Sequence, residues 1–419
     1  TTLFRSDQIP DGMARSPLTG EIEDKEIAKV KTMKKLRVLL LLALTSAFIL
    51  TGCGAKEEET PVPDETVEEQ PIEEIEETPS AEDEIVEDDQ IPDGMARSPL
   101  TGEIEDKEIA KQRPLAIMLP TDKAAQPQYG IGQAGVLYEC MEEGDMSRQM
   151  AIIEDWQGIE KLGNVRSCRD YYVYWALEWD PILVHFGGPY YLADIINRPD
   201  VNNITGCAVN STSSAPGCNA FYRTSDKPVP HNAYTSGANL VEQCDSLGYS
   251  LTHINENYHA EHFQFAKKEL NTLESDEDSF DATEISLKGA FPYTKSSLEY
   301  DAATGFYKKN LYESPQTDGA TGEQLTFENV IVQFTYYEVR DAKGYLSFKC
   351  HDDTQDGYYI TNGKAVHIRW GKTSDYAPTK YYYDDLTPVE FNPGKTYIAV
   401  VQNDKYVTIN GTDYASSVQ

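Results

Sequence analysis

Short apolar runs alternate with amphipathic stretches from residue 113 to about residue 250. The apolar runs, which are typical of buried strands, are PLAIMLP (114–120), SRQMAIIEDW (147–156) and DPILVHF (180–186). A helix is predicted over residues 167–179, where aromatic side chains recur along one side, and a second over residues 240–247. Strands interleaved with helices predict an α/β layer, so we expect an α/β N-terminal domain over residues 113–250.

From about residue 285 the pattern changes to aromatic and β-branched runs separated by Gly, Asp and Asn. These runs are FYKKNLY (306–312), ENVIVQFTYYEVR (328–340), GYLSFKCHD (344–352) and KTYIAVVQ (395–402). Asn362-Gly363 lies between two further runs and is a strong signal for a two-residue hairpin. We therefore expect a mainly antiparallel β C-terminal domain over residues 285–419, joined by a connector over 251–284. The predicted fold class is mixed, α+β.

The segment before these domains has the pattern of an export signal. Basic residues follow Met33, an apolar run extends from Val38 to Leu50, and Leu50-Thr51-Gly52-Cys53 follows. The apolar run is shorter than the roughly 20 residues that span a bilayer. Small residues before a cysteine resemble the lipobox of bacterial lipoproteins, in which that cysteine is lipidated. We predict a signal peptide over 33–53 and a lipid anchor on Cys53, which places the protein on the outer face of the bacterial cytoplasmic membrane. A plain secretory signal with a chance cysteine is the alternative.

Residues 1–32 are anomalous because a signal peptide is expected at the N-terminus. The segment DQIPDGMARSPLTGEIEDKEIAK occurs at 7–29 and recurs without change at 89–111. A repeat of this length with so few apolar residues does not build a solenoid. We interpret residues 1–32 as a misassigned start, an assembly error or a recent duplication, and exclude them from fold reasoning.

The net charge of −34 is concentrated in one segment. Residues 57–89 contain 17 acidic residues and no Lys or Arg, together with several prolines. Such a composition cannot bury enough apolar surface to fold, so we predict an acidic, disordered stalk over 54–112. An acidic interaction tail is the alternative. The sign of the charge and the absence of a basic stripe argue against nucleic acid as a partner.

Candidate ligand-binding residues gather in the N-terminal domain. Arg166 and Arg169 are three residues apart, so they share a helix face, in a first turn where free N–H groups and the helix dipole favour an anion. His185 ends an apolar strand and precedes Gly187-Gly188, a turn that lets a ligand approach the backbone.

A proline-flanked loop adds Arg223 and His231-Asn232 to these candidates. If all of them converge, guanidinium, imidazole and amide groups suit a carboxylate, a phosphate or a uronic or muramic-type sugar. The structural alternative is that the arginines pair with Glu139, Glu142 or Glu143, while the histidines hold the local fold.

Catalysis is a further alternative, with His185 or His231 as the general acid or base. A nucleophile is harder to identify. Ser167 has no GxSxG motif around it, and Cys168 at a helix start is expected to have a lowered pKa, although a packed small residue is the other interpretation.

The remaining cysteines and histidines do not predict a metal or cofactor. Cys207 and Cys218 bracket a Ser/Gly/Pro-rich loop, so a disulfide is plausible in an exported protein. No CxxC pair occurs. The sequence His259-Ala260-Glu261-His262 is not HExxH and specifies no third ligand, so we interpret it as a solvated connector.

The second half carries many aromatic residues, which can contact a sugar or a protein but more often fill a core. They are Tyr358, Tyr359, Trp370, Tyr376, Tyr381, Tyr382 and Tyr383. If the last three form a strand, at least one of them is exposed.

Several longer motifs resemble the YerB-like lipoproteins of Firmicutes. They include RPLAIML (113–119), VLYECMEEGDMSR (136–148), GNVRSCRDYY (163–172), HFGG (185–188), FYRTSDKPVPHNAYTS (221–236), GYYITNGKAVHIRWGKTS (357–374) and FNPGKTYIAVV (391–401). The resemblance covers nearly all of the chain beyond the stalk. It implies an envelope location and a two-part ectodomain, and it implies no reaction.

Our leading hypothesis is therefore an extracytoplasmic binding protein for an anionic envelope-derived ligand, a glycan or a peptide. A cell-wall hydrolase or transferase that uses His185 or His231 is the first alternative. An envelope scaffold that uses the aromatic face of the C-terminal domain is the second.

Overall fold

The structure is a computed structural model that describes residues 91–211, 213–215, 217–254, 258, 262–267 and 271–418, and two short strands near the N-terminus. Residues 86–419 form one compact unit. The predicted signal peptide, Cys53 and the acidic segment lie outside the described residues, so they stay predictions. None of the described helices is long and apolar enough to cross a membrane.

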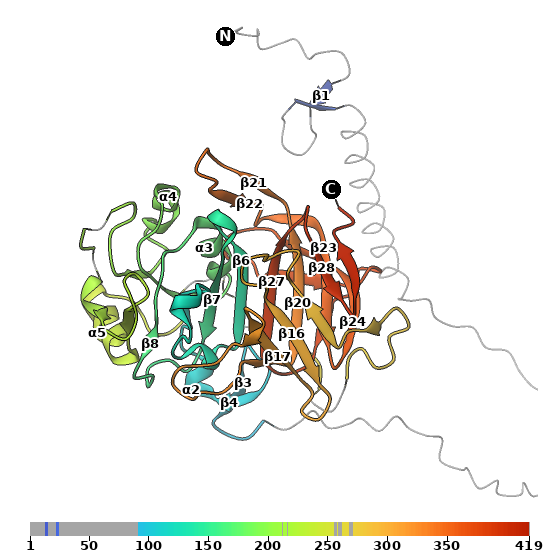
Figure 1. Cartoon of the computed structure of the whole chain (residues 1–419), viewed down its shortest axis with the longest axis horizontal. Helices are drawn as coiled ribbons and strands as arrows, with labels where there is room; N and C mark the ends of the chain where they lie inside the picture. The colour runs from blue at the N-terminus through green and yellow to red at the C-terminus, as the bar shows by residue number, and fades with distance from the viewer. Residues whose placement is uncertain are drawn as a thin grey trace, which may run out of the picture. The chain divides into compact units, whose positions relative to one another are not determined.

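An 11-stranded mixed sheet forms the centre of this unit (Figure 1). In order its strands are β10 (Asn203–Thr205), β9 (Ile182–His185), β5 (Leu115–Pro120), β7 (Ser147–Ile153), β6 (Val136–Met141), β27 (Thr396–Gln402), β20 (Asn329–Thr335), β23 (Asp352–Thr361), β24 (Lys364–Lys372) and β14 (Phe280–Asp281), with β25 (Lys380–Tyr382) also paired to β24. The two halves of the chain meet where β6 pairs in parallel with β27. One sheet therefore runs through both halves.

A second, seven-stranded sheet belongs entirely to the C-terminal half, and all of its pairings are antiparallel. In order its strands are β18 (Ser314–Pro315), β17 (Phe306–Leu311), β16 (Ser297–Asp301), β15 (Glu284–Ser286), β28 (Tyr406–Ile409) and β29 (Thr412–Ala415), with β19 (Thr326–Phe327) paired to β17. The mixed fold class, with an α/β first half and an antiparallel second half, is confirmed.

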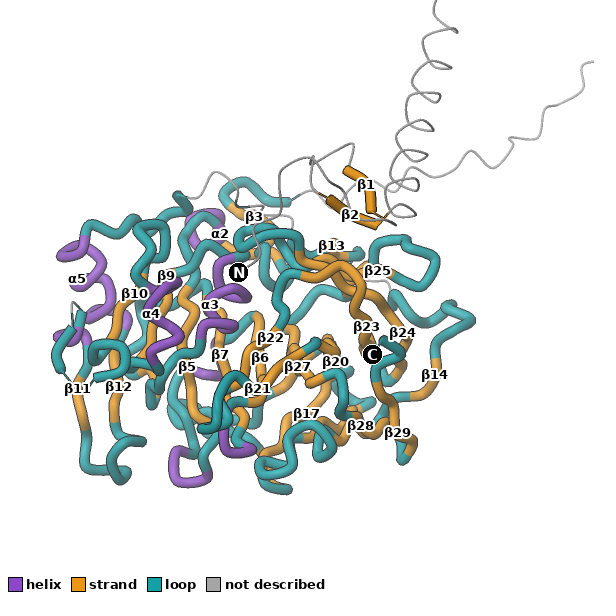
Figure 2. Tube along the Cα trace, turned by 90° about the horizontal axis from the view of Figure 1, so that it is seen from above, coloured by secondary structure: helices purple, strands orange, loops and turns teal. Residues whose placement is uncertain are grey.

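Three helices of the first half lie on the side of the unit away from β23 and β24, as Figure 2 shows. They are α3 (Asp170–Leu177), α4 (Ala193–Ile196) and α5 (Gly237–Leu247). Helix α5 is capped at its N-terminus by Ser236, whose hydroxyl accepts from the Asn239 N–H, and at its C-terminus by Gly248, whose φ of 72° is the left-handed conformation that glycine tolerates best. Beside these helices β11 (Tyr222–Arg223), β12 (Ala233–Thr235) and β8 (Leu162–Gly163) form a three-stranded sheet.

The folded unit begins earlier than the expected end of the stalk at residue 112. A hairpin of β3 (Met95–Arg97) and β4 (Ile104–Asp106) leads into the short helix α2 (Lys107–Ala110). Leu100, between the two strands, is 1% exposed and belongs to the hydrophobic core. Ser98 donates its hydroxyl to Glu154 at 2.5 Å. Buried apolar and polar contacts thus fix a segment whose composition predicted a stalk. The identical upstream repeat forms a hairpin of the same register, β1 (Met13–Arg15) with β2 (Ile22–Asp24).

A buried carboxylate after α3 ties the two halves together. Glu178 accepts hydrogen bonds from the Tyr138 hydroxyl at 2.6 Å and from the backbone and hydroxyl of Thr379 at 2.7 Å. Lys372 Nζ lies 3.3 Å from the same carboxylate, and neither side chain is exposed. Burial alone would raise the pKa of Glu178, but Lys372 and the hydrogen bonds outweigh it and hold that pKa well below its usual range. The C-terminal half therefore completes a charged network that begins in the N-terminal half.

Candidate functional site

The carboxyl ends of the parallel strands β5 and β9 are crossed by the extended segment that precedes α3. The Arg166 N–H donates to the Met118 carbonyl of β5, and the Phe186 N–H, directly after β9, donates to the Arg166 carbonyl. The Cys168 N–H donates to the Gly187 carbonyl. These three bonds hold Arg166 at the edge of the sheet where α/β proteins place their ligands.

Arg166 differs from its neighbours at this edge because its charged group is unpaired within the part of the chain that the structure describes. Its side chain is half-buried, and among the described residues its guanidinium makes no hydrogen bond and no ion pair; its Nε is buried without a partner. Burial lowers the pKa of the Arg166 guanidinium, and Arg148 lowers it further, while Asp122 opposes both. A guanidinium that is already partly desolvated and unpaired is prepared to receive an anion.

Arg148, on β7, lies under the same edge and is 2% exposed. It donates to Glu142 at 2.5 Å and to the Ser167 carbonyl at 2.8 Å. Its Nε has no hydrogen-bond partner among the described residues. Arg148 therefore adds a second, buried positive charge. Its bond to Glu142 leaves the Nε of Arg148 free to donate to a ligand.

Asp122 and His231 complete the arrangement. His231 Nδ1 lies 4.0 Å from Asp122 Oδ2, too far for a hydrogen bond, and both atoms are buried without a partner among the described residues. Burial lowers the pKa of His231, with Asp122 opposing and Arg166 and Arg148 reinforcing the shift. We call Asp122, Arg148, Arg166 and His231 the basic cluster.

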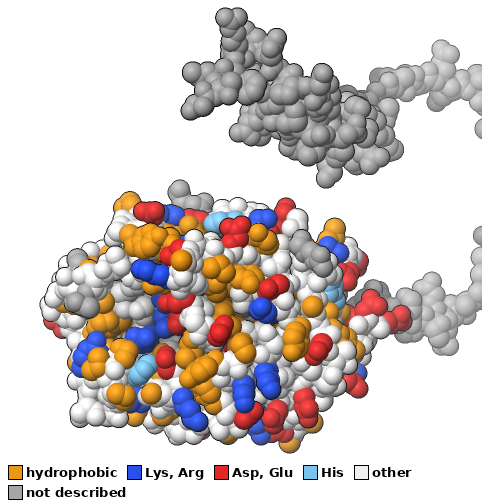
Figure 3. All heavy atoms as spheres, turned by 45° about the horizontal axis from the view of Figure 1, so that its top comes forward, with side chains coloured by type: hydrophobic (Ala, Val, Ile, Leu, Met, Phe, Trp, Pro, Cys, Tyr) orange, Lys and Arg blue, Asp and Glu red, His pale blue; other side chains and the backbone are white. Residues whose placement is uncertain are grey.

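The loops that carry Asp122 and His231 are fixed to each other by hydrogen bonds to one carbonyl. Asn164 Nδ2 donates to the Ala125 carbonyl at 2.9 Å, and Lys227 Nζ donates to it at 2.6 Å. The loop that follows Asp122 is thus bonded to the segments that carry Asn164 and Lys227. On the face drawn in Figure 3, Lys and Arg side chains are interspersed with Asp and Glu side chains.

Arg169 is paired, in contrast to Arg166. Its Nη2 lies 3.0 Å from Glu142 Oε2, and its guanidinium also contacts Glu143 closely. The expectation that both arginines share the first turn of a helix is wrong, because α3 starts only at Asp170 and Arg169 is its extended N-cap. For Arg169 the structure agrees with the ion-pair alternative.

His185 and Gly187 are buried, and Gly188 is half-buried but closely packed. His185 is 0% exposed, and its ring contacts the Gly187 carbonyl at 2.9 Å and Asn203 Oδ1 at 3.3 Å. A Cβ at Gly187 would lie 2.6 Å from the Cys207 sulfur, and one at Gly188 would lie 2.8 Å from the Cys168 carbonyl. Close packing, not ligand approach, requires these glycines.

Arg223 and Asn232 bond to each other beside the three-stranded sheet. Arg223 Nη1 donates to Asn232 Oδ1 at 2.7 Å, and the Asn232 amide donates to the Thr224 carbonyl at 2.7 Å. The Arg223 guanidinium also lies over the Phe186 ring, 4.8 Å from its centroid. Of the predicted residues, the structure brings Arg166, Arg169 and His231 together. Arg223 and Asn232 instead stabilise the neighbouring loop through their hydrogen bond.

The two weak nucleophile candidates are engaged elsewhere. Ser167 donates its hydroxyl to the Phe186 carbonyl at 3.1 Å. Cys168 is fully buried, and this burial raises the pKa of its thiol to about 12, which corrects the expected lowering at a helix start. Neither residue has the environment of an activated nucleophile.

The predicted Cys207–Cys218 disulfide is not formed. Both are free thiols: Cys207 packs against Gly187, whereas the Cys218 sulfur lies 3.8 Å from Asn219 Oδ1. His262 is buried and stacks on Trp179 with ring centroids 3.6 Å apart; His259 lies outside the described residues. Within the described part of the chain, no group of three or more His, Cys, Asp and Glu side chains is arranged for a metal ion.

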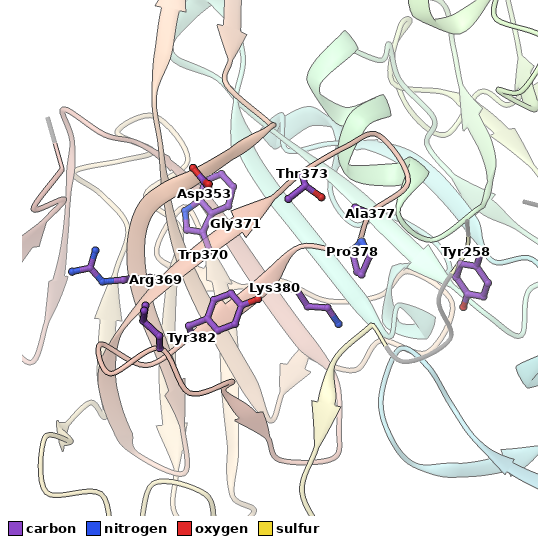
Figure 4. Close-up of a pocket in the computed structure, with 11 residues that line it drawn as sticks. Tyr258, Asp353, Arg369, Trp370, Gly371, Thr373, Ala377, Pro378, Lys380 and Tyr382 are labelled. Carbon is purple, nitrogen blue, oxygen red and sulfur yellow. The ribbon is translucent and has the colours of Figure 1, made fainter. Parts of the chain in front are cut away.

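A second candidate is a cavity of about 830 Å³ beside β24 and β25. Figure 4 shows Arg369 and Tyr258 at opposite ends of it, with Tyr382 and Pro378 between them. Its cationic side chains are engaged: Arg369 Nε lies 3.3 Å from Asp384, and Lys380 donates to the His262 carbonyl at 3.2 Å.

The aromatic residues near this cavity offer little free ring surface. Tyr359, Trp370 and Tyr381 are buried, and the Trp370 indole N–H donates to the Phe334 carbonyl at 2.8 Å. Tyr382 and Tyr383 are half-buried, and β25 ends at Tyr382, so the three tyrosines do not form one strand and none of them is fully exposed. The basic cluster, with its unpaired charged groups, is therefore the stronger candidate site.

Sequence reasoning missed Asp122 and Arg148. A signal existed for both of them. Asp122 follows a buried strand by two residues, where ligand-binding side chains of α/β sheets are common. Arg148 is a charged residue in a strand that continues as an apolar run, a position where burial requires partners.

Comparisons with known proteins agree with this architecture. Residues 100–250 match the family model described as "Protein of unknown function (DUF3048) N-terminal domain", and residues 287–398 match the model of the DUF3048 C-terminal domain. The chain is 24% identical over 322 residues to "Putative lipoprotein YerB" of Bacillus subtilis (strain 168), which covers 75% of this chain and 89% of that protein. The crystal structure of the YerB protein from Bacillus subtilis matches with a TM-score of 0.62 at 21% identity, over 75% of this chain and 99% of that one, and shows a shared fold. The resemblance found in the sequence is confirmed: the chain belongs to the family of proteins of unknown function defined by the DUF3048 N-terminal and C-terminal domains.

Proposed function

We propose that this protein is a lipid-anchored, extracytoplasmic binding protein that holds an anionic, envelope-derived ligand on the basic cluster. The observation that carries the proposal is the Arg166 guanidinium, which is partly desolvated and, among the described residues, unpaired. A buried donor without a partner costs about 1–3 kcal/mol, and more when it is charged. An anion that bonds Arg166 would remove this cost and at the same time gain from the charge of Arg148.

Two observations support the proposed location at the outer face of the membrane. Leu50-Thr51-Gly52-Cys53 has the pattern of a lipobox, and the curated relative carries the name lipoprotein. The segment between Cys53 and the folded unit is acidic and rich in proline, a composition that suits a spacer. We therefore expect the N-terminal lipid to insert into the membrane and the basic cluster to bind the ligand.

The ligand site is tested by thermal unfolding of residues 86–419, the compact unit, with sulfate, phosphate and acetate at matched ionic strength. A ligand at about a hundred times its dissociation constant adds about 2.7 kcal/mol to the free energy of unfolding, which raises the melting temperature. We expect this rise in the wild-type fragment and its loss in Arg166→Ala. The matched control is Arg369→Ala, since Arg369 is exposed, pairs with Asp384 and lines the other candidate cavity.

Two outcomes would contradict the proposal. An equal rise in the wild type and in Arg166→Ala would remove Arg166 from the site. Loss of the rise in Arg369→Ala, with Arg166→Ala unaffected, would move the site to the cavity beside β24 and β25.

A further inference from the structure

We propose that the ligand of the basic cluster is the carboxyl end of a peptide, held by its terminal carboxylate and its last amide N–H together. This inference rests on the proposed function and narrows it from anions in general to one class. It follows from the mixture of groups at the site, from their spacing and from the space beside them.

The basic cluster contains an unsatisfied acceptor as well as unsatisfied donors. Arg166 Nε and Arg148 Nε are donors without a partner, whereas Asp122 Oδ2 is a buried acceptor without a partner among the described residues. A sulfate or a phosphodiester has no hydrogen to donate to Asp122, so it would leave that carboxylate oxygen without a partner. A ligand that satisfies every unpaired atom must therefore carry a negative group and a hydrogen-bond donor side by side.

The spacing of these atoms selects the chemistry further. His231 Nδ1 and Asp122 Oδ2 are 4.0 Å apart. In the last residue of a peptide, the amide nitrogen and the carboxylate carbon are two bonds apart, about 2.5 Å through space. One such residue can thus give its N–H to Asp122 while its carboxylate accepts from His231 and Arg166.

Space for the side chain of such a residue lies next to Asp122. A cavity of about 200 Å³ is lined by Lys123, Gln126, Pro127 and Tyr312 among others. Its lining residue Lys123 follows Asp122 directly in the chain, and the hydroxyl of its lining residue Tyr312 donates to the Thr121 carbonyl at 3.0 Å. The apolar surfaces of Pro127 and Tyr312 would cover an aliphatic side chain, and the rest of the peptide would extend into solvent.

Calorimetric titration of residues 86–419 with two matched probes tests this assignment. N-acetylglycine carries the amide N–H beside its carboxylate, and acetoxyacetate replaces only that N–H by an ester oxygen. We expect N-acetylglycine to bind at least roughly tenfold more tightly, because a hydrogen bond to a charged acceptor is lost in the ester. Asp122→Ala should abolish this preference, and Arg166→Ala should weaken both probes. Glycolate, which carries a hydroxyl in place of the amide, is the third probe.

The outcomes separate this inference from the proposed function. Equal binding of the two matched probes, with both weakened in Arg166→Ala, would overturn the peptide assignment and leave an anion site. Glycolate binding as tight as that of N-acetylglycine would overturn it in favour of a hydroxy acid. No binding of any probe, sulfate included, would overturn both proposals. Melting temperatures of each variant establish that the loss of binding is not a loss of folding.

Discussion

Lys309 Nζ lies 3.2 Å from Glu139 Oε2, and neither side chain has any exposure to solvent. Glu139 is on β6 in the first half of the chain, and Lys309 is on β17 in the second sheet. The carboxylate also accepts from Ser296 at 2.6 Å and from the Tyr397 hydroxyl at 2.9 Å. Burial alone would raise the pKa of Glu139, but Lys309 and these hydrogen bonds outweigh it and hold that pKa below its usual value. The pair therefore links the 11-stranded sheet to the seven-stranded sheet, through two residues that are far apart in the sequence.

Removal of the buried lysine should destabilise the whole unit. Lys309→Met leaves Glu139 as an uncompensated buried charge, and such a loss costs about 3–5 kcal/mol. Urea unfolding of residues 86–419 measures this cost. The matched control is Lys308→Met, because the side chain of the adjacent Lys308 is 44% exposed and its ion pair with Asp301 is partly solvated, a setting in which a pair is worth about 1 kcal/mol or less. Equal effects of the two substitutions would show that the buried pair is not structural.

The hairpin that begins the folded unit should respond to pH. Glu105 on β4 faces Glu154 at the end of β7. Burial and the charge of Asp155 raise the pKa of Glu105 to about 7, with smaller contributions from Glu103 and Asp106, while a hydrogen bond with Glu154 opposes the rise. Burial and the charge of Glu105 raise the pKa of Glu154 to about 8. The unfolded chain releases these protons near pH 4.5, so the stability is full below that pH and falls as the pH rises through 7 and 8.

Glu105→Gln should remove most of this pH dependence and raise the melting temperature at pH 8 relative to the wild type. Glu108→Gln, an exposed carboxyl on the same segment, should leave the dependence unchanged. Melting curves of residues 86–419 between pH 5 and pH 9 make the comparison. A wild-type stability that rises from pH 5 to pH 8 would refute the proposed contact of the two carboxyl groups.

The turn after β9 should tolerate no side chain at its first glycine. Gly187 has a φ of 69°, and a Cβ there would lie 2.6 Å from the Cys207 sulfur. Gly144 has a φ of 76° with nothing within 4 Å, so Gly144→Ala measures the backbone strain alone. We expect Gly187→Ala to cost about 1–3 kcal/mol more than Gly144→Ala because of overpacking. Equal unfolding midpoints for the two variants would instead indicate that the turn is open enough for a ligand to approach it.

Local patterns were enough to predict many of the elements. The apolar runs at 114–120, 147–156 and 180–186 became β5, β7 and β9, and Asn362-Gly363 became the turn between β23 and β24. These features depend on neighbours in sequence. The parallel pairing of β6 with β27 joins segments about 260 residues apart, and no local signal specifies it.

The candidate site was predictable only in part, for the same reason. Arg166 and His231 were recognised by residue type, but their partners come from other loops. That Arg169 is paired while Arg166 is not depends on where Glu142 and Glu143 lie after folding. His185 illustrates the limit, since a histidine at a strand end has the same sequence signature whether it faces a ligand or, as here, is buried.

The most direct test of the central claim observes the Arg166 guanidinium itself. In residues 86–419 with 15N-labelled arginine, the Nε–H resonance of Arg166 is assigned by its loss in Arg166→Ala. The spectrum is then followed during titration with N-acetylglycine and with sulfate. The account predicts a saturable shift of the Arg166 resonance with at least one of these anions, while that of Arg369 stays in place. An Arg166 resonance that does not move with either anion, at concentrations that fully occupy the protein, would contradict it.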